Sequence, residues 1–102
     1  MEVLINKENK DLTVVKLKGR LDTPAAQEIA PEIETLEAAA SGTIVIDCSD
    51  LSYISSSGLR IFLSLRKAAA VKGGNVIVKA ISNDIRQVFM MTGFLNLFQI
   101  ED

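Results

Sequence analysis

The amino-acid sequence predicts an α/β fold: a single domain over residues 1–102, with helices packed against a mixed β-sheet of four to five strands. Three observations support this class. Short β-branched segments alternate along the chain with longer segments whose apolar residues recur at helical spacing. Residues 43–46 are β-branched throughout, which is typical of a covered central strand. The strand–helix–strand order that follows implies a right-handed crossover between parallel strands.

The first elements are expected to be a β-hairpin. Apolar residues at 3–5 and 12–17 predict its two strands, and the polar residues 6–11 predict the turn between them. Gly19 is expected to end the second strand.

The first helix is expected to start at Thr23, whose hydroxyl can cap it, and at Pro24, which suits the first helical position. Pro31 lies inside this segment and is expected to kink or divide the helix, because proline lacks an amide proton. Three alanines at 38–40 extend the helix to a stop at residues 41–42. Its inner face is formed by a stripe of Ile29, Ile33 and Leu36.

The second half is expected to begin with the central strand at 43–46 and a loop from Asp47 to Ser55. A helix from about Ser56 to Lys72, a Gly-Gly stop and a strand at 75–80 complete the crossover unit. Ser82 or Asn83 can cap a third helix, whose inner face would comprise Ile85, Val88, Phe89 and Thr92 and whose stop is Gly93. Residues 97–100 are expected to form a closing strand or a packed extension.

The composition argues against several classes of function. A net charge of −2 and scattered Lys and Arg argue against nucleic-acid binding. No apolar run reaches the ~18 residues that a membrane span needs, and the N-terminus lacks the features of a signal peptide. A single cysteine, Cys48, favours a reducing, cytoplasmic setting. We therefore expect a cytoplasmic protein that neither inserts into membranes nor binds nucleic acid.

The chain contains no histidine, which removes Ser–His and Cys–His catalytic arrangements and the commonest transition-metal ligand. One cysteine cannot build a structural zinc site. We therefore expect no enzyme activity, no metal and no cofactor. An enzyme with Ser56 as its nucleophile remains the alternative, although no histidine could activate that serine.

The serines at 55–57, followed by Gly58, mark the start of the second helix and allow two interpretations. In the first, one serine caps the helix, with Ser57 the expected cap, and Gly58 permits close packing. In the second, the cluster is a modification site. A helix N-terminus presents unpaired amide protons and a partial positive charge, which would accommodate the ~1.5 to 2 negative charges of a phosphate.

The exposed face of the second helix is the expected partner surface. Arg60, Ser64 and Lys67 lie together on a helical wheel, and Ile61 lies beside them. Ile61 is either an exposed apolar anchor for a partner or an ordinary surface isoleucine. Arg66 falls within the apolar arc and is expected to extend outward. The residues expected to face the core are Leu59, Phe62, Leu63, Ala69 and Ala70.

The run at 51–59, Leu-Ser-Tyr-Ile-Ser-Ser-Ser-Gly-Leu, resembles the signature loop of STAS domains, a family named for sulfate transporters and anti-sigma factor antagonists. Four further segments match the family in order: residues 19–22, 73–76, 80–82 and 89–94. The resemblance covers nearly the whole chain, so residues 1–102 are identified as one STAS domain. Its length is similar to that of freestanding bacterial anti-sigma factor antagonists.

That resemblance implies a mechanism called partner switching. The unmodified antagonist binds an anti-sigma factor that is also a serine kinase, phosphorylation of a loop serine abolishes binding, and a serine phosphatase resets the switch. By position the phosphorylated residue is Ser56, with Ser57 and Ser55 as second choices. The resemblance implies a partner-binding surface of Asp22, Thr23, Ser55, Ser56, Ser57, Gly58, Arg60, Ile61 and Ser64.

The sequence departs from the family pattern at two positions. Ser55 stands where an Asp usually precedes the phosphorylated serine, and Arg60 replaces a small residue. These departures keep a second function open: a non-switching STAS scaffold, or an accessory subunit of a lipid-transport ATPase or a signalling complex. Nucleotide binding and the oligomeric state are left open by the sequence.

Overall fold

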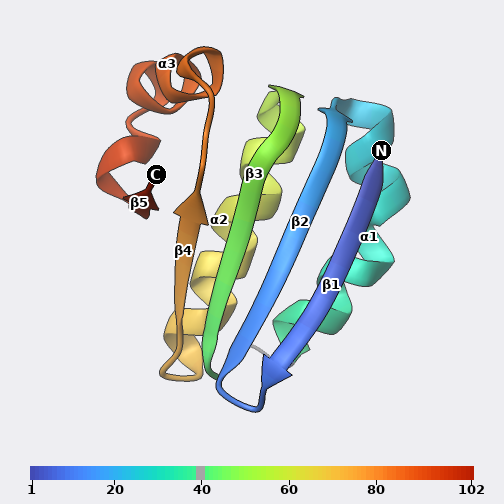
Figure 1. The fold of residues 1–102 in the computed structure, drawn as a ribbon, viewed down its shortest axis with the longest axis vertical. Coiled ribbons are helices and arrows are strands. Elements are labelled where there is room, and N and C mark those ends of the chain that lie inside the picture. Colours follow the sequence, from blue (N-terminus) through green and yellow to red (C-terminus); the bar gives the residue numbers. More distant parts are fainter. Residues whose placement is uncertain (39–40) are drawn as a thin grey trace.

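The structure, a computed structural model, describes residues 1–38 and 41–102. Its sheet has the strand order β1-β2-β3-β4-β5, in which β1 is antiparallel to β2 and all other neighbours are parallel (Figure 1). This confirms the predicted fold class. In chain order the elements are β1 (Glu2–Asn9), β2 (Leu12–Leu21), α1 (Thr23–Ala38), β3 (Thr43–Ile54), α2 (Ser56–Val71), β4 (Asn75–Lys79), α3 (Asn83–Thr92), a 3-10 turn (Phe94–Asn96) and β5 (Gln99–Glu101).

The core lies between the sheet and the helices. Helices α1 and α2 lie side by side behind the sheet, and α3 lies beyond the end of β4 (Figure 1). Phe62 of α2 makes edge-to-face contacts with Phe89 and Phe98, with ring centroids 5.9 and 6.3 Å apart. The predicted stripe of α1 is buried as expected at Ile29, Ile33 and Leu36. No helix in the described residues is both long and apolar enough to cross a bilayer.

The N-terminal hairpin differs from the prediction in the length of its strands. β1 continues through the polar residues to Asn9, because an edge strand can pair its backbone while its side chains stay in water. Gly19 does not end β2, which continues to Leu21. Gly19 has φ +106°, and the register shift between Gly19 and Arg20 instead marks a bulge in which Ser52 of β3 is the extra residue.

The prediction of a loop from Asp47 to Ser55 is wrong, since β3 continues to Ile54. The backbone of this segment pairs with β2 as far as the pair Leu21–Ile54. Cys48, Leu51 and Ile54 point into the core, while intervening polar residues face outward. The polar residues concealed this strand because register shifts interrupt the regular period of two.

Cys48 lies 1% exposed beneath the helices. Burial raises the pKa of its thiol to about 12, and the neighbouring Asp47 carboxylate adds to that shift. The thiol is therefore neutral at physiological pH, and a neutral thiol has low reactivity.

Helix α1 differs from the prediction at its start and at Pro31. Asp22 caps it, with its Oδ1 accepting from the Ala25 amide at 3.0 Å, so Thr23 is the first helical residue and Pro24 the second. Pro31 does not divide the helix. Buried residues on both sides of Pro31 hold α1 on the core, which offsets the roughly 3 kcal/mol cost of an internal proline. The predicted extension through residues 39–40 lies outside the described residues.

The later elements follow the prediction closely. Helix α2 ends one residue early, at Val71, and β4 ends at Lys79. Ser82 is the cap of α3, and Gly93, with φ +80°, is its stop. Two inner-face assignments are wrong: Thr92 is exposed and bonds back to the Val88 carbonyl, and Ala70 is exposed while Leu65 is buried. Leu63 and Val88 are half-buried, and the closing strand is β5.

Candidate functional site

The serine cluster lies where two neighbouring strands end. Leu21 closes β2 and pairs with Ile54, which closes β3. The Ser55 amide donates to the Leu21 carbonyl at 2.9 Å, and the Ser55 hydroxyl donates to the same oxygen at 3.0 Å. The start of α2 is thereby tied to the end of β2, which places it beside the start of α1.

Ser55 is the N-cap of α2, so the expectation that Ser57 caps this helix is wrong. The Ser55 Oγ accepts from the Gly58 amide at 3.2 Å, and the Ser55 carbonyl accepts from the Leu59 amide at 3.0 Å. One hydroxyl therefore caps the helix and also donates to Leu21. An aspartate at this position would supply the cap but, when ionised, no donor.

Gly58 is buried against the sheet, and the structure supports the packing interpretation of this glycine. A Cβ at this position would lie 2.7 Å from Leu21 Cγ and 2.9 Å from Ile54 Cγ1. Only glycine lets the first turn of α2 approach the two strand ends this closely. The predicted site residue Gly58 thus positions its neighbours and exposes little surface of its own.

Ser56 and Ser57 differ in the surroundings of their hydroxyls. Ser56 is exposed, and no hydrogen bond joins its hydroxyl to any other described residue. Ser57 is half-buried, with its Oγ 3.2 Å from Thr23 Oγ1. Both amides precede the first hydrogen bond of α2, so neither has an acceptor within the helix.

The start of α1 completes the site from the neighbouring element. The contact between Thr23 and Ser57 brings Thr23 and Asp22 next to the cluster, as predicted. Two helix N-termini therefore lie side by side, and their partial positive charges combine. The Asp22 carboxylate partly offsets this field but is already bonded to the Ala25 amide.

Further along α2, three predicted site residues line a shallow groove against α1, with a volume of about 290 Å³. Ile61 is half-buried and packs against the core, so it is not a freely exposed anchor. The Ser64 hydroxyl donates to Glu37 Oε1 at 2.5 Å, and Arg60 is exposed at the rim. The lining residues are Ala30, Ile33, Glu34, Glu37, Arg60, Ile61 and Ser64.

Reasoning from the sequence did not identify Arg20 and Tyr53 as candidate contact residues. The Arg20 guanidinium carbon lies 4.3 Å from the centre of the Tyr53 ring, one residue pair before the strand ends. Tyr53 is 40% exposed, so part of its ring is available to a partner. The aromatic residue within the run at 51–59 was the available signal in the sequence. Because this segment was predicted to be a loop, the pairing of Tyr53 with Arg20 could not be inferred.

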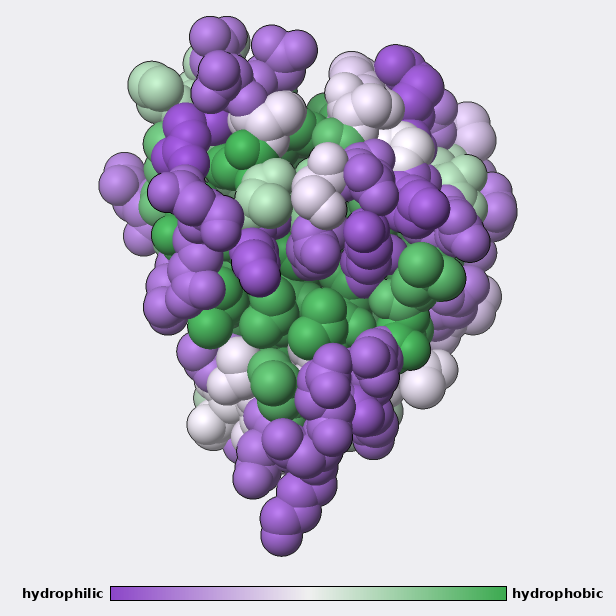
Figure 2. All heavy atoms as spheres, in the orientation of Figure 1, coloured by the Kyte–Doolittle hydropathy of each residue, from purple (hydrophilic) through white to green (hydrophobic). Residues whose placement is uncertain are grey.

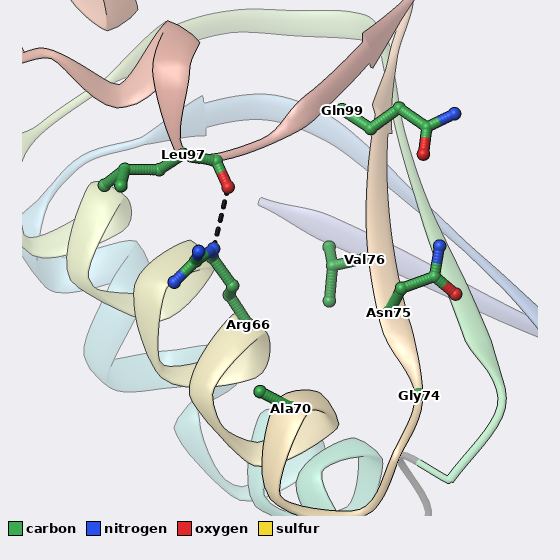
Figure 3. A pocket seen from close by; sticks show the side chains of 7 residues that line it. All are labelled: Arg66, Ala70, Gly74, Asn75, Val76, Leu97 and Gln99. Carbon is green, nitrogen blue, oxygen red and sulfur yellow. Dashed lines mark hydrogen bonds between the residues drawn. The ribbon is translucent and has the colours of Figure 1, made fainter.

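A second cavity of about 280 Å³ lies at the opposite end of the sheet, between α2 and the start of β4 (Figure 3). Arg66 points toward the carbonyl of Leu97, to which its Nε donates at 2.7 Å. Arg66 is exposed as predicted, and the cavity is remote from the serine cluster. Within the described ranges, no three His, Cys, Asp or Glu side chains gather as metal ligands.

Known proteins share the sequence pattern and the fold of this chain. The STAS domain profile matches residues 4–102. A candidate anti-sigma factor antagonist, BtrV of Bordetella bronchiseptica, is 27% identical over 89 residues, covering 87% of this chain and 77% of the relative. An anti-sigma-B factor antagonist of Staphylococcus epidermidis is 24% identical over 90% of this chain and 85% of the relative. The unphosphorylated form of the anti-sigma factor antagonist SpoIIAA, which is 24% identical, shares the fold with a TM-score of 0.77 over 99% of this chain and 88% of its own. The phosphorylated form of SpoIIAA, from Bacillus, shares the fold with a TM-score of 0.76 over 99% of this chain and 91% of its own.

Proposed function

Because the chain belongs to the STAS domain family, we propose that it is an anti-sigma factor antagonist whose binding to an anti-sigma factor is controlled by phosphorylation of Ser56. The names of its relatives support the first part of this proposal. One observation carries the second part. Among the three serines of the cluster, Ser56 is the exposed one, and no described residue bonds to its hydroxyl.

The surroundings of Ser56 favour a phosphate. Ser56 is the first residue of α2, where the free amides and the partial positive charge of the helix favour anions. Arg60 lies one turn further along the same helix and can approach the added charge. Phosphorylation would therefore leave the fold intact while giving the surface ~1.5 to 2 additional negative charges.

The same charge would oppose a partner that covers this end of the molecule. We place the partner on the exposed residues around the two helix starts and along the α1–α2 groove. A phosphate buried under a bound protein would lose its hydration without a matching cation, which is costly. The proposed contact residues are Asp22, Thr23, Ser56, Ser57, Arg60, Ile61 and Ser64, with Ser55 and Gly58 holding the backbone beneath them.

The chain in this proposal is a substrate and a ligand, not an enzyme. An anti-sigma factor with serine kinase activity transfers a phosphoryl group from ATP to the Ser56 oxygen, which loses its proton. A serine phosphatase hydrolyses the ester and restores the hydroxyl. Both reactions take place in the cytoplasm, where sigma factors act.

We test this first by phosphorylation in vitro. The chain and its Ser56→Ala and Ser57→Ala variants are incubated with ATP and the anti-sigma factor that co-purifies with the unmodified chain. Mass spectrometry then measures the gain of one phosphate. We expect wild type and Ser57→Ala to gain it and Ser56→Ala to remain unmodified.

Phosphate on Ser57 or Ser55, or equal modification of Ser56→Ala, would refute the assignment. Co-purification with a transport ATPase and with no kinase would replace the proposal by the non-switching scaffold.

A further inference from the structure

One face of the sheet carries no helix within the described part of the chain (Figure 1). Figure 2 looks onto this face and shows a hydrophobic band between hydrophilic regions. Strand pairing identifies the band, because Val14, Val45 and Ile77 are paired neighbours in one row across β2, β3 and β4. All three are half-buried, and Leu4 of β1, at 46% exposure, lies in the next row, where it is paired with Lys16.

The adjacent row is charged, and its signs alternate. Lys16, Asp47, Lys79 and Glu101 are successive pairing partners across β2, β3, β4 and β5. Burial alone would raise the pKa of Asp47. The Ser49 amide and hydroxyl and the flanking lysines outweigh it, so this pKa lies below its usual 3.8. The row therefore reads plus, minus, plus, minus at neutral pH.

We propose that this face binds a second copy of the chain about a twofold axis that runs parallel to the strands, between β3 and β4. With that axis β2 lies opposite β5 of the second copy, and β3 lies opposite its β4. Each Lys16 then faces a Glu101, and each Asp47 faces a Lys79. In the apolar row Val45 meets Ile77 across the axis, at the ~10 Å spacing of packed sheets.

The charge pattern selects this axis over its neighbours. An axis along β3 would place Lys16 opposite Lys79 and Asp47 opposite itself. An axis perpendicular to the strands through the charged row would oppose every charge to its own copy. An axis between β2 and β3 would pair Lys16 with Asp47 but leave Lys79 and Glu101 unmatched. Only the axis between β3 and β4 pairs all four charges, and this self-complementarity identifies a second copy as the occupant.

The arrangement has a consequence for the serine site. A twofold axis parallel to the strands keeps the strand direction, so both copies of Ser56 point to the same end of the dimer. The helices lie on the outer faces and stay free. A dimer would therefore present two partner surfaces side by side, although its formation does not depend on the proposed function.

The test is a charge exchange followed by analytical ultracentrifugation of the full chain. Wild type is expected to approach twice its 11.1 kDa as concentration rises. Lys79→Glu and Asp47→Lys, each alone, bring like charges together and are expected to weaken dimerisation roughly tenfold or more. Mixed in equal amounts, the two variants are expected to form a heterodimer, because each introduced charge then faces its opposite. Lys10→Glu, in the exposed β1–β2 turn, changes net charge away from this face and is the matched control.

Each outcome decides the proposal. A wild type that stays monomeric to millimolar concentration overturns it, as does a Lys79→Glu variant that dimerises like wild type. Two variants that remain monomeric when mixed, with native circular dichroism, also overturn it. Failure of Ser56 phosphorylation in the kinase assay leaves this proposal unaffected, so the two can fail separately.

Discussion

Ser55, Ser56 and Ser57 carry the same hydroxyl group in three different surroundings. Ser55 caps α2 and donates to Leu21, Ser57 meets Thr23, and Ser56 faces solvent. The sequence could place a cap within this run but could not choose the residue. The choice follows from where β2 and β3 end, and that depends on pairing between segments that are 33 residues apart in the closing Leu21–Ile54 pair.

The cap at Ser55 is expected to stabilise the fold. Ser55→Ala removes the acceptor of the Gly58 amide, so we expect the free energy of unfolding to fall by about 1 kcal/mol. Ser55→Asp retains an acceptor and should lose less. Urea denaturation followed by circular dichroism measures both variants.

Ser82→Ala is the matched control, because Ser82 caps α3 in the same way through the Ile85 amide. It should lose a similar amount of stability while leaving the serine site unchanged. A Ser55→Ala variant as stable as wild type would contradict the assignment of the cap.

Among the elements, β3 and α2 together position the site. The strand delivers α2 to the edge of the sheet, and the first turn of α2 rests on Leu21 and Ile54 through Gly58. Ser55 supplies both the cap of α2 and a donor to the Leu21 carbonyl, so this junction needs no carboxylate at that position. The junction therefore depends on the absence of a side chain at Gly58 as much as on the cap.

Gly58→Ala tests this packing. Alanine favours a helix by up to about 1 kcal/mol over glycine, but its methyl group would overlap Leu21 and Ile54. We expect the overlap to dominate and the free energy of unfolding to fall by about 1 to 3 kcal/mol. Ser56→Ala, two residues earlier and exposed, should change stability by less than about 0.5 kcal/mol. A Gly58→Ala variant more stable than wild type in urea would show that the interface can relax.

For the whole molecule, the sequence predicted the order of elements because apolar periodicity reports directly on burial. Residues such as Ile29, Ile33 and Phe62 therefore fell correctly into the core. The prediction from the sequence missed the second half of β3. There, polar residues separate the core residues, and two register shifts against β2 interrupt the regular pattern.

Surfaces formed by the pairing of strands could not be predicted from the sequence either. The contact between Arg20 and Tyr53 joins neighbouring strands, and the alternating charges from Lys16 to Glu101 come from four strands. Register, which is set by tertiary structure, brings these residues together.

In the proposed switch, a phosphate on Ser56 prevents the chain from binding its anti-sigma factor. The direct measurement is calorimetric titration of the co-purified anti-sigma factor with the chain before and after phosphorylation, with Ser57→Asp as the comparison for a charge on a neighbouring contact residue. We predict that phosphorylation of Ser56 lowers the affinity by roughly two orders of magnitude and that Ser57→Asp lowers it less, since Ser57 is half-buried. Equal affinity of the phosphorylated and unphosphorylated chain would rule out Ser56 as the switch.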